Sequence, residues 1–435
     1  MKNSVETPSL RLKQSVVDAI IAGLLALIVF GPVVGVVLDG YSFNLQPTRV
    51  AMIVFGVIVG RFALSVFLQT PSGIRFAQSL EMPGAGIHVL SPEHKSKLRI
   101  IVPIMIMAAI VLPMISNKYI LTVVILGLIY VLLGLGLNIV VGLAGLLDLG
   151  YVAFYAIGAY GLALGYQYLG LGFWSALPLA AIAAAVAGCI LGFPVLRMHG
   201  DYLAIVTLGF GEIIRLVLNN WLSFTGGPNG LSVPSPTIFG LEFGLRAKYG
   251  GVPIHEFFGF TYNPDLKFIF IYTILVLVVL AVLYIKHRLT RMPIGRGWEA
   301  LREDEIACRS MGLNHVLVKL SAFTIGASTA GLAGVFFATY QGFVNPTSFT
   351  FFESALILAI VVLGGMGSTV GVVIAAFVLT VAPELLRSFS EYRVLLFGVL
   401  MVLMMLWRPR GLIRISRIGV KPRKGAAGWV EGATR

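Results

Sequence analysis

A series of long apolar runs constrains the fold of this chain more than any other feature. A helix needs about 20 mostly apolar residues to cross the hydrocarbon layer of a membrane. Runs that approach or exceed this length lie at residues 16–38, 50–68, 98–115, 119–141, 151–169, 173–196, 202–221, 268–285, 316–340, 349–363, 370–386 and 394–407. A β-barrel would show short alternating segments instead, so we predict that all of these runs are membrane-spanning helices.

The composition supports lipid as the solvent. Hydrophobic residues make up 58% of the 435 residues, charged residues make up 12%, and the mean hydropathy is +0.93. A soluble domain carries roughly 25% charged residues. The low charged fraction excludes a cytosolic enzyme, a disordered chain and a secreted domain built on disulfides. The two cysteines, Cys189 and Cys308, form no disulfide framework.

The basic residues predict the orientation. If the N-terminus is cytoplasmic, 23 of the 32 Lys and Arg residues fall in inside segments and 7 in outside segments. This bias predicts an even number of spans with both termini cytoplasmic. It also explains the net charge of +13 without nucleic acid as a partner. Re-entrant elements at 116–118 or 364–371 would reduce twelve spans to ten.

The chain divides into three parts by its composition. Residues 1–96 form a separable two-span extension, residues 97–411 form the core with a polar loop near 286–315, and residues 412–435 form a basic cytoplasmic tail. Five GxxxG spacings, such as Gly188/Gly192, predict close helix packing. Glycines also crowd the region around Asp148, which predicts either broken helices beside a cavity or further close packing.

Several enzyme motifs are absent from the sequence. It contains no Gly-Lys pair for a Walker loop, no HExxH or Cys/His metal spacing and no Gly-x-Ser-x-Gly elbow. We therefore predict that the chain is not an enzyme, that it holds no cofactor or metal, and that it moves a substrate across the membrane.

Polar side chains within apolar runs are candidates for a substrate pathway, because burying them in lipid is costly. These candidates are Asn138, Asp148, Glu212 and Glu353. Glu212 and Arg215 are i, i+3 neighbours, so a purely structural ion pair is an equally good interpretation. Asp148 has no neighbour of opposite charge in the sequence and fits either a cavity or the end of a span.

A long polar loop at residues 223–266, predicted to lie outside, contains a dense turn sequence. The turn comprises Thr225, Gly226, Gly227, Pro228, Asn229 and Gly230. The loop is a candidate surface for an external protein. From composition alone, a solvated connector with aromatic residues at the membrane interface is the favoured alternative.

Residues 295–312 predict one short amphipathic helix on the cytoplasmic side. Trp298, Leu301, Cys308 and Met311 fall on one side of it, and Gly312 is a natural terminator. Such a helix is typical of docking into a groove on a soluble subunit. The alternative, adsorption to the lipid surface, is disfavoured by its mixture of acidic and basic residues.

The segments 133–146, 200–213, 225–230 and 356–368 resemble the branched-chain amino-acid permeases of the LivM type, as does the Glu299-Ala300 pair followed by Gly312. The Glu-Ala pattern is that of the coupling loop in ABC-importer permeases, although the glycine lies further downstream than in the common version. The resemblance covers about residues 100–411. It implies an all-α polytopic bundle of about 10–12 transmembrane helices, similar to the larger (type II-like) class of ABC importers.

The resemblance also implies partners and a location, namely a bacterial plasma (inner) membrane. It implies a second permease of the LivH type, two cytoplasmic ATPases that use the ATP, an external amino-acid-binding protein and membrane lipid. The residues that would contact an ATPase are Trp298, Glu299, Ala300, Leu301, Arg302, Glu303, Asp304, Met311 and Gly312. Trp298, Leu301 and Met311 are expected to fill a groove on the ATPase, with the charged residues at its rim.

Three alternatives remain open at this stage. Related permeases carry urea, short amides or sugars. An ion-driven secondary transporter would need its own carboxylate relay, and a membrane scaffold would need only the amphipathic helix.

Overall fold

The computed structural model describes residues 118–385, apart from gaps at 196–197, 199, 239–240, 244–251 and 260–264. It also describes residues 36–39 and 42–45 and the single positions 48, 51, 55, 56, 59 and 398. The predicted span at 98–115, almost all of those at 16–38, 50–68 and 394–407, and the basic tail lie outside the described residues.

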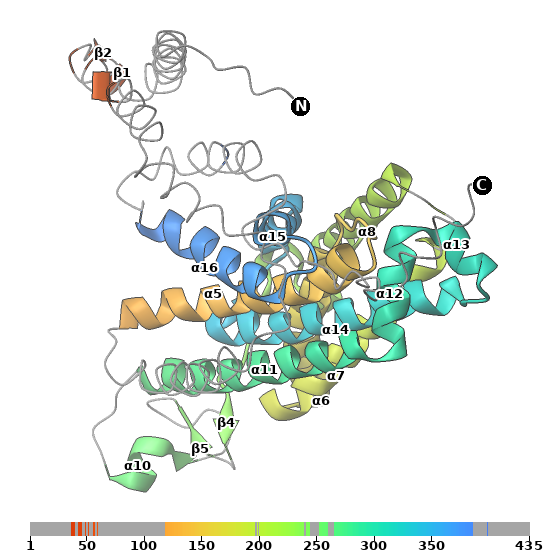
Figure 1. Ribbon diagram of the computed structural model, residues 1–435. Coiled ribbons are helices and arrows are strands. Elements are labelled where there is room, and N and C mark those ends of the chain that lie inside the picture. The colour runs from red at the N-terminus through yellow and green to blue at the C-terminus, as the bar shows by residue number, and fades with distance from the viewer. Residues whose placement is uncertain are drawn as a thin grey trace, which may run out of the picture. The chain divides into compact units, whose positions relative to one another are not determined.

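The described part of the chain is mainly helical (Figure 1). The α-helices are α5 (Lys118–Leu137), α6 (Val152–Leu169), α7 (Phe173–Val195), α8 (Asp201–Asn220), α9 (Leu222–Thr225), α10 (Ile254–Phe258), α11 (Asp265–Arg291), α12 (Pro293–Glu303), α13 (Glu305–Ser310), α14 (His315–Gln341), α15 (Phe351–Gly364) and α16 (Thr369–Leu385). A π-helix, η1 (Asn138–Leu143), continues α5, and η2 (Gly227–Asn229) and η3 (Pro346–Ser348) are 3-10 turns.

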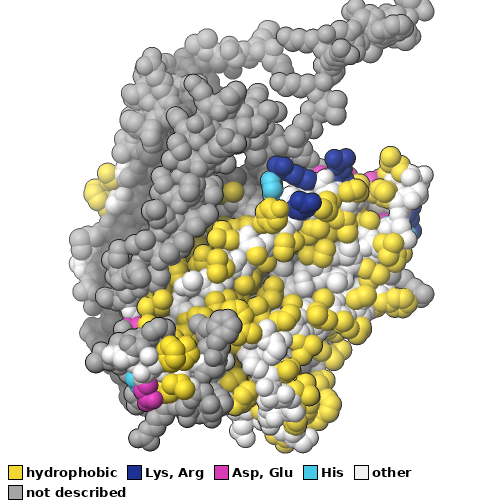
Figure 2. Space-filling model, turned by 90° about the horizontal axis from the view of Figure 1, so that it is seen from below, with side chains coloured by type: hydrophobic (Ala, Val, Ile, Leu, Met, Phe, Trp, Pro, Cys, Tyr) yellow, Lys and Arg dark blue, Asp and Glu magenta, His cyan; other side chains and the backbone are white. Residues whose placement is uncertain are grey.

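Six described helical segments are long and apolar enough to cross a membrane. They are Lys118–Leu143, Phe173–Pro194, Tyr202–Asn220, Asp265–Arg291, His315–Gln341 and Pro346–Gly364. Hydrophobic side chains accordingly cover most of the described surface in Figure 2, and Lys and Arg gather at one margin of it. The structure therefore confirms the prediction of a polytopic helical membrane protein.

Helix α14 lies at the centre of the bundle and packs against α5, α6 and α7 (Figure 1). Small residues allow the backbones to approach. A Cβ added at Gly158 of α6 would lie 2.2 Å from the carbonyl oxygen of Gly331 in α14, and one added at Gly188 of α7 would lie 2.6 Å from Ala327 Cβ. Close approach of this kind gives dispersion contacts where lipid provides no hydrophobic driving force.

Two irregular segments interrupt the helices. In η1 the backbone shifts to longer-range hydrogen bonds, and Ala144 N–H donates to Ile139 O at 3.1 Å. Residues 144–150 are then non-helical, which agrees with the predicted break around Asp148. A tight turn at residues 365–368 separates α15 from α16, with Gly365 and Gly367 at positive φ.

Short strands occur where the sequence analysis predicted either helix or loop. The strands are β1 (Val36–Asp39), β2 (Ser42–Leu45), β3 (Leu231–Ser232), β4 (Thr237–Ile238), β5 (Leu241–Glu242), β6 (Val252–Pro253) and β7 (Phe343–Val344). The predicted helical run to residue 38 is wrong at its end, because β1 begins at Val36 and forms an antiparallel hairpin with β2. Strands β4, β5 and β6 form a small sheet within the predicted outside loop.

The chain clusters into two compact units. One comprises Met1–Ile87 with Ser416–Arg435 and contains the β1–β2 hairpin. The other, His88–Ile415, contains all the helices described above and every candidate site residue. The proposed boundaries at residues 96 and 411 remain predictions.

Candidate functional sites

The predicted amphipathic helix at 295–312 is two helices, and Asp304 separates them. Asp304 is extended, with φ −160° and ψ 114°, and its carboxylate accepts hydrogen bonds from the N–H groups of Ile306 and Ala307. It is therefore the N-cap of α13, a role for which aspartate is strongly preferred. Gly312 adopts φ +77° after α13, which confirms that it ends this segment.

The apolar side of α12 is buried inside this chain. Trp298 is 0% exposed, and its Nε1–H donates to Val318 O at 3.2 Å and to Ser321 Oγ at 2.9 Å in α14. Leu301 is also buried. The expectation that Trp298 and Leu301 fill a groove on another subunit is therefore wrong for this conformation, because the apolar stripe packs on the chain's own helix.

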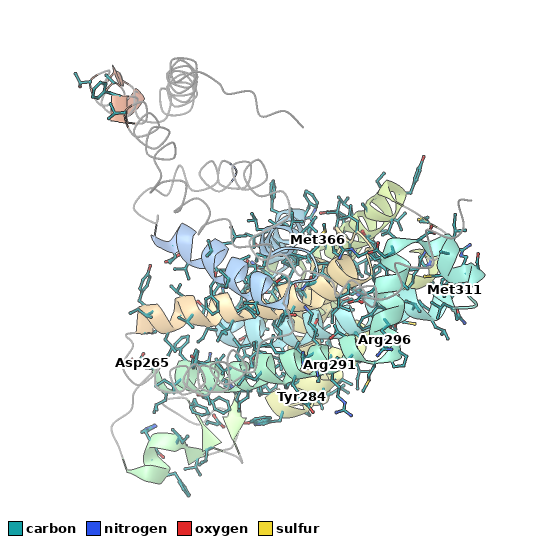
Figure 3. All side chains as sticks on the ribbon, viewed as in Figure 1. Asp265, Tyr284, Arg291, Arg296, Met311 and Met366 are labelled. Atoms are coloured by element: carbon teal, nitrogen blue, oxygen red, sulfur yellow. The ribbon has the colours of Figure 1, made fainter. Side chains whose placement is uncertain are left out.

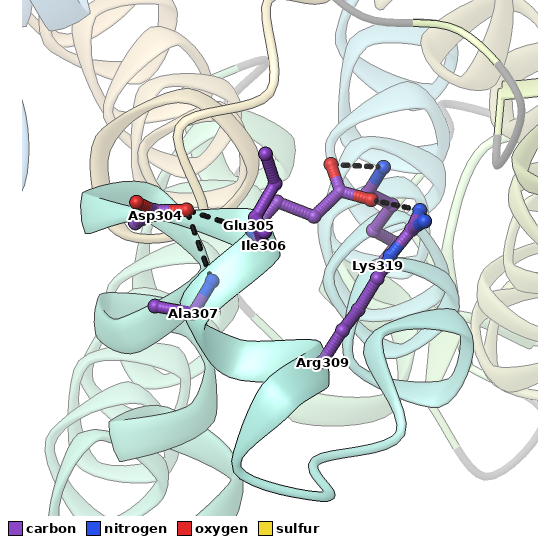
Figure 4. Close-up of polar contacts among 6 residues, drawn as sticks. All are labelled: Asp304, Glu305, Ile306, Ala307, Arg309 and Lys319. Carbon is purple, nitrogen blue, oxygen red and sulfur yellow. Dashed lines mark hydrogen bonds and ion pairs between the residues drawn. The ribbon is translucent and has the colours of Figure 1, made fainter.

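An ion-pair network attaches α13 to α14. Lys319 is 1% exposed, and its Nζ lies 2.8 Å from Glu305 Oε2 (Figure 4). The other oxygen, Oε1, lies 2.6 Å from Arg309 Nη2, at the i, i+4 spacing that favours helical ion pairs. A buried ammonium needs such a partner, so Glu305 holds α13 against the start of α14.

Large exposed apolar side chains lie on α13, directly after it and in the first turn of α14. Ile306 is 76% exposed, Met311 82% and Leu317 62%. Among the other predicted docking residues, Glu299, Glu303 and Asp304 are also exposed and Ala300 is half-buried. Met311 lies at the same end of the bundle as Arg291 and Arg296, opposite Asp265 (Figure 3). The α12–α13 pair thus buries one face against α14 and exposes another to solvent.

Arg302 points back into the bundle instead of outward. Its Nη1 donates a hydrogen bond to the carbonyl of Gly142, within η1. The same side chain passes over Gly145, where an added Cβ would lie 2.8 Å from Arg302 Cγ. Arg302 was predicted at a polar rim, and the structure places it between α12 and η1.

Asn138 joins η1 to the turn between α15 and α16. It is 0% exposed, its Oδ1 accepts from Gly367 N–H at 2.7 Å, and its Nδ2 donates to Ser368 O at 3.2 Å. Asn138 was a pathway candidate. Here it satisfies backbone groups at a helix break, as a buried amide must.

Asp148 and Glu353 occupy different surroundings. Asp148 is 0% exposed; its Oδ1 accepts from Gly150 N–H at 2.9 Å, and its Oδ2 has no hydrogen-bond partner among the described residues. Glu353 lies in the first turn of α15 and accepts from Tyr130 OH at 2.6 Å. A carboxylate in the first turn is favoured by the helix dipole.

Glu212 and Arg215 form the predicted ion pair on α8. Arg215 Nη2 lies 2.7 Å from Glu212 Oε2, and each side chain is about one-third exposed. Because an exposed charge pair within an apolar helix is costly in lipid, this edge of α8 requires water or protein beside it. Each of the four pathway candidates thus has its own hydrogen-bond or ion-pair partner.

The turn at 225–230 is more tightly packed than its sequence suggested. Gly226, Gly227 and Gly230 all have positive φ, and a Cβ at Gly230 would lie 2.2 Å from Val344 O. Thr225 is buried and donates to Leu218 O at 2.6 Å. The segment then pairs as β3 with β7. Exposure in this turn is greatest at Pro228 and Asn229.

Sequence reasoning missed two buried lysines. Lys319 was counted only as an inside charge, although a lysine within an apolar run is a signal that a carboxylate lies nearby. Lys286 in α11 is 2% exposed, and its Nζ has no hydrogen-bond partner in the described part of the chain. Its position at the end of an apolar run gave no such signal.

A bundle of apolar helices with interrupted segments inside and a helical pair at one end is the architecture of a polytopic membrane permease. The family model described as branched-chain amino acid transport system / permease component matches residues 119–405, which is more than half of the chain. The chain belongs to this family. A second model, a domain of unknown function, matches residues 14–112.

Similar proteins agree with this assignment. The chain is 55% identical to the high-affinity branched-chain amino acid transport system permease protein LivM of Escherichia coli K12, over 76% of this chain and 78% of the relative. Identity to LivM of Salmonella typhimurium is 59%, over 69% and 71%. The LivH permease protein of E. coli K12 is 26% identical, over 66% and 92%. No solved structure matches the chain significantly.

Proposed function

We propose that this chain is a transmembrane subunit of an ATP-driven importer for branched-chain amino acids. Its membership of the permease family and its LivM relatives support this proposal. The α12–α13 pair is the structural feature that supports the proposal, because a fixed helical pair with exposed apolar side chains suits a soluble partner. In this proposal two cytoplasmic ATPases hydrolyse the ATP, and the chain itself needs no cofactor.

Reconstitution tests the proposal. Proteoliposomes that contain this chain, a LivH-type second permease and the ATPases should accumulate leucine when ATP and the external binding protein are present. Omission of ATP or of the ATPases should abolish uptake. Uptake by this chain alone, driven by an ion gradient, would instead identify a secondary transporter. Nucleotide binding by the isolated chain would contradict the assignment of ATP to its partners.

The substrate class needs its own measurement. The names of the relatives support branched-chain amino acids, whereas similar permeases serve urea, short amides or sugars. Excess unlabelled leucine, isoleucine or valine should compete with radiolabelled leucine uptake in the reconstituted complex. Urea, acetamide and ribose at the same concentrations should not compete.

We assign the ATPase-docking surface to the exposed side of the α12–α13 pair, the turn that follows it and the first turn of α14. Ile306, Met311 and Leu317 would supply the apolar centre, and Glu299 and Glu303 the rim. Interface energy concentrates in a few desolvated apolar anchors, which cost about 2 kcal/mol or more when truncated. Trp298 and Leu301 support this surface from beneath.

The external binding protein would dock at the other end of the bundle. The Gly-rich turn at 225–230 lies at the opposite end of α8 from Asp201, and it exposes Pro228 and Asn229. Charge-reversing substitutions are unsuitable there because the turn is uncharged. Pro228→Ala with Asn229→Trp should weaken binding-protein stimulation of ATP hydrolysis and leave basal hydrolysis unchanged.

Both termini are proposed to be cytoplasmic, because basic residues concentrate on that side of the membrane. Alkaline phosphatase fused to either end should be inactive, and green fluorescent protein fused there should fluoresce. Opposite results at the two ends would imply an odd number of spans.

A further inference from the structure

Arg302 occupies a junction of three segments that are far apart in the sequence. Its Nη1 donates to Gly142 O in η1, its stem crosses Gly145, and a Cβ on Gly367 would lie 3.6 Å from Nη1. The guanidinium therefore lies where α12 meets both η1 and the turn between α15 and α16. Trp298, on the same helix, bonds α14 instead.

The two segments that Arg302 reaches are themselves locked together. Asn138 at the start of η1 bonds the backbone of Gly367 and Ser368. A Cβ on Gly142 would lie 1.9 Å from Asn138 Oδ1 and 2.5 Å from Gly367 N, so no free space separates them. Packed contacts without voids transmit displacement because neither side can move alone.

The junction is also a place where the helices can change shape. A π-helical turn has a hydrogen-bond pattern that differs from that of the α-helix it interrupts, and such turns are frequent at functional sites. Gly365 and Gly367 occupy left-handed conformations in the adjoining turn. A shift at this junction would tilt α15 and α16 relative to α5. Helix α15 carries Glu353, and α5 carries its partner Tyr130.

We propose that Arg302 is the positioning residue that transmits movement of the α12–α13 pair to the helix breaks at η1 and at residues 365–368. Pulling on α12 displaces the Gly142 carbonyl through the guanidinium, and Asn138 carries that displacement to the α15–α16 turn. The inference rests on the proposed docking of an ATPase at α12–α13. It adds the route by which that docking acts on the membrane helices.

The ratio of substrate transported to ATP hydrolysed tests the proposal. Arg302→Ala should assemble with the ATPases and retain ATP hydrolysis, while the ratio of substrate transported to ATP hydrolysed falls severalfold. Arg302→Lys keeps one charged donor and should recover part of the ratio. Arg291→Ala removes an exposed positive charge at the same end of the bundle and should leave the ratio unchanged.

A second variant separates transmission from folding. Asn138→Ala retains the contact between Arg302 and Gly142 but cuts the bonds to the α15–α16 turn, so it should lower the same ratio. If Arg302→Ala transports with the ratio of the unmodified complex, the proposal is wrong. If it loses thermal stability and both activities in equal measure, Arg302 is only structural. Failure of the unmodified complex to couple uptake to ATP would refute the proposed function instead.

Discussion

Lys319 Nζ lies 2.8 Å from Glu305 Oε2, and this contact joins a buried side chain near the start of α14 to the short helix α13. The lysine side chain is 1% exposed, whereas the glutamate side chain is 17% exposed. Removing one partner from a buried pair leaves an uncompensated charge, which costs far more than the pair contributes. The pair therefore determines where α13 is held.

Glu305→Ala should destabilise the protein strongly, by about 3–5 kcal/mol, because it leaves the Lys319 ammonium buried without its carboxylate. The double variant Glu305→Ala/Lys319→Met should be more stable than Glu305→Ala alone, since the remaining charge is gone. The midpoint of thermal unfolding of the purified protein in detergent measures both effects.

Arg309→Ala is the matched control for this network. Arg309 contacts the same carboxylate, but its side chain is 46% exposed. Exposed pairs contribute about 0–1 kcal/mol, so the unfolding midpoint should change little. If the stability losses of Glu305→Ala and Lys319→Met simply add in the Glu305→Ala/Lys319→Met variant, Glu305 and Lys319 are not energetically coupled.

Gly158→Ala should prevent normal packing of α6 on α14. The added methyl would lie 2.2 Å from the carbonyl oxygen of Gly331, so the backbones must separate. Overpacking of this kind typically costs about 1–3 kcal/mol. Gly161→Ala on the same helix is the control, because its nearest neighbour would be Ala180 Cβ at 3.5 Å. Monodisperse elution in size-exclusion chromatography should be lost for Gly158→Ala and kept for Gly161→Ala.

The helices were largely predictable because hydrophobicity in a membrane protein is a strong and local signal. The predicted runs at 151–169, 173–196 and 202–221 match α6, α7 and α8 to within about one residue at each end. The run at 268–285 was too short, since α11 extends from Asp265 to Arg291 with charged residues at both ends. Polar ends of a long helix carry no hydropathy signal.

The candidate sites were less predictable because they depend on contacts between distant parts of the chain. Amphipathicity identified the apolar side of α12, but it does not tell whether that side packs on the same chain or on a partner. The break at Asp304 was hidden because aspartate also fits a helix interior in a charged segment. Arg302 reaches Gly142 from 160 positions away, and the spacing of residues along the sequence contains no trace of that contact.

Cys308 should react slowly with maleimide at neutral pH. Burial raises the pKa of its thiol above the ordinary value of 9.0, and the negative charges of Asp304 and Glu305 raise it further. The thiolate is the reactive form, so the rate should rise as the pH increases toward and past that raised pKa. Because the folded thiol holds its proton more tightly, its contribution to stability is complete below pH 9 and declines above it.

The alkylation rate of Cys308 is measured in a Cys189→Ala background, which leaves one thiol. The same rate in denaturant gives the unfolded reference. Movement of α13 on ATPase binding would change the rate at fixed pH. Alkylation of the folded chain at the unfolded rate at pH 7 would contradict the burial and the raised pKa of this thiol.

Substitution of Trp298 should lower the stability of the protein, whereas substitution of Met311 should lower its assembly with the ATPase. Trp298 is 0% exposed, with two hydrogen bonds from its indole N–H to α14, so Trp298→Ala should cost about 3–5 kcal/mol and lower the yield of folded protein. Met311 is 82% exposed. Met311→Asp should leave the unfolding midpoint unchanged and reduce ATPase co-purification, because it places a charge at the centre of the proposed interface. The reverse result, a stable Trp298→Ala protein that fails to bind the ATPase, would show that α12 turns its indole outward when the complex forms.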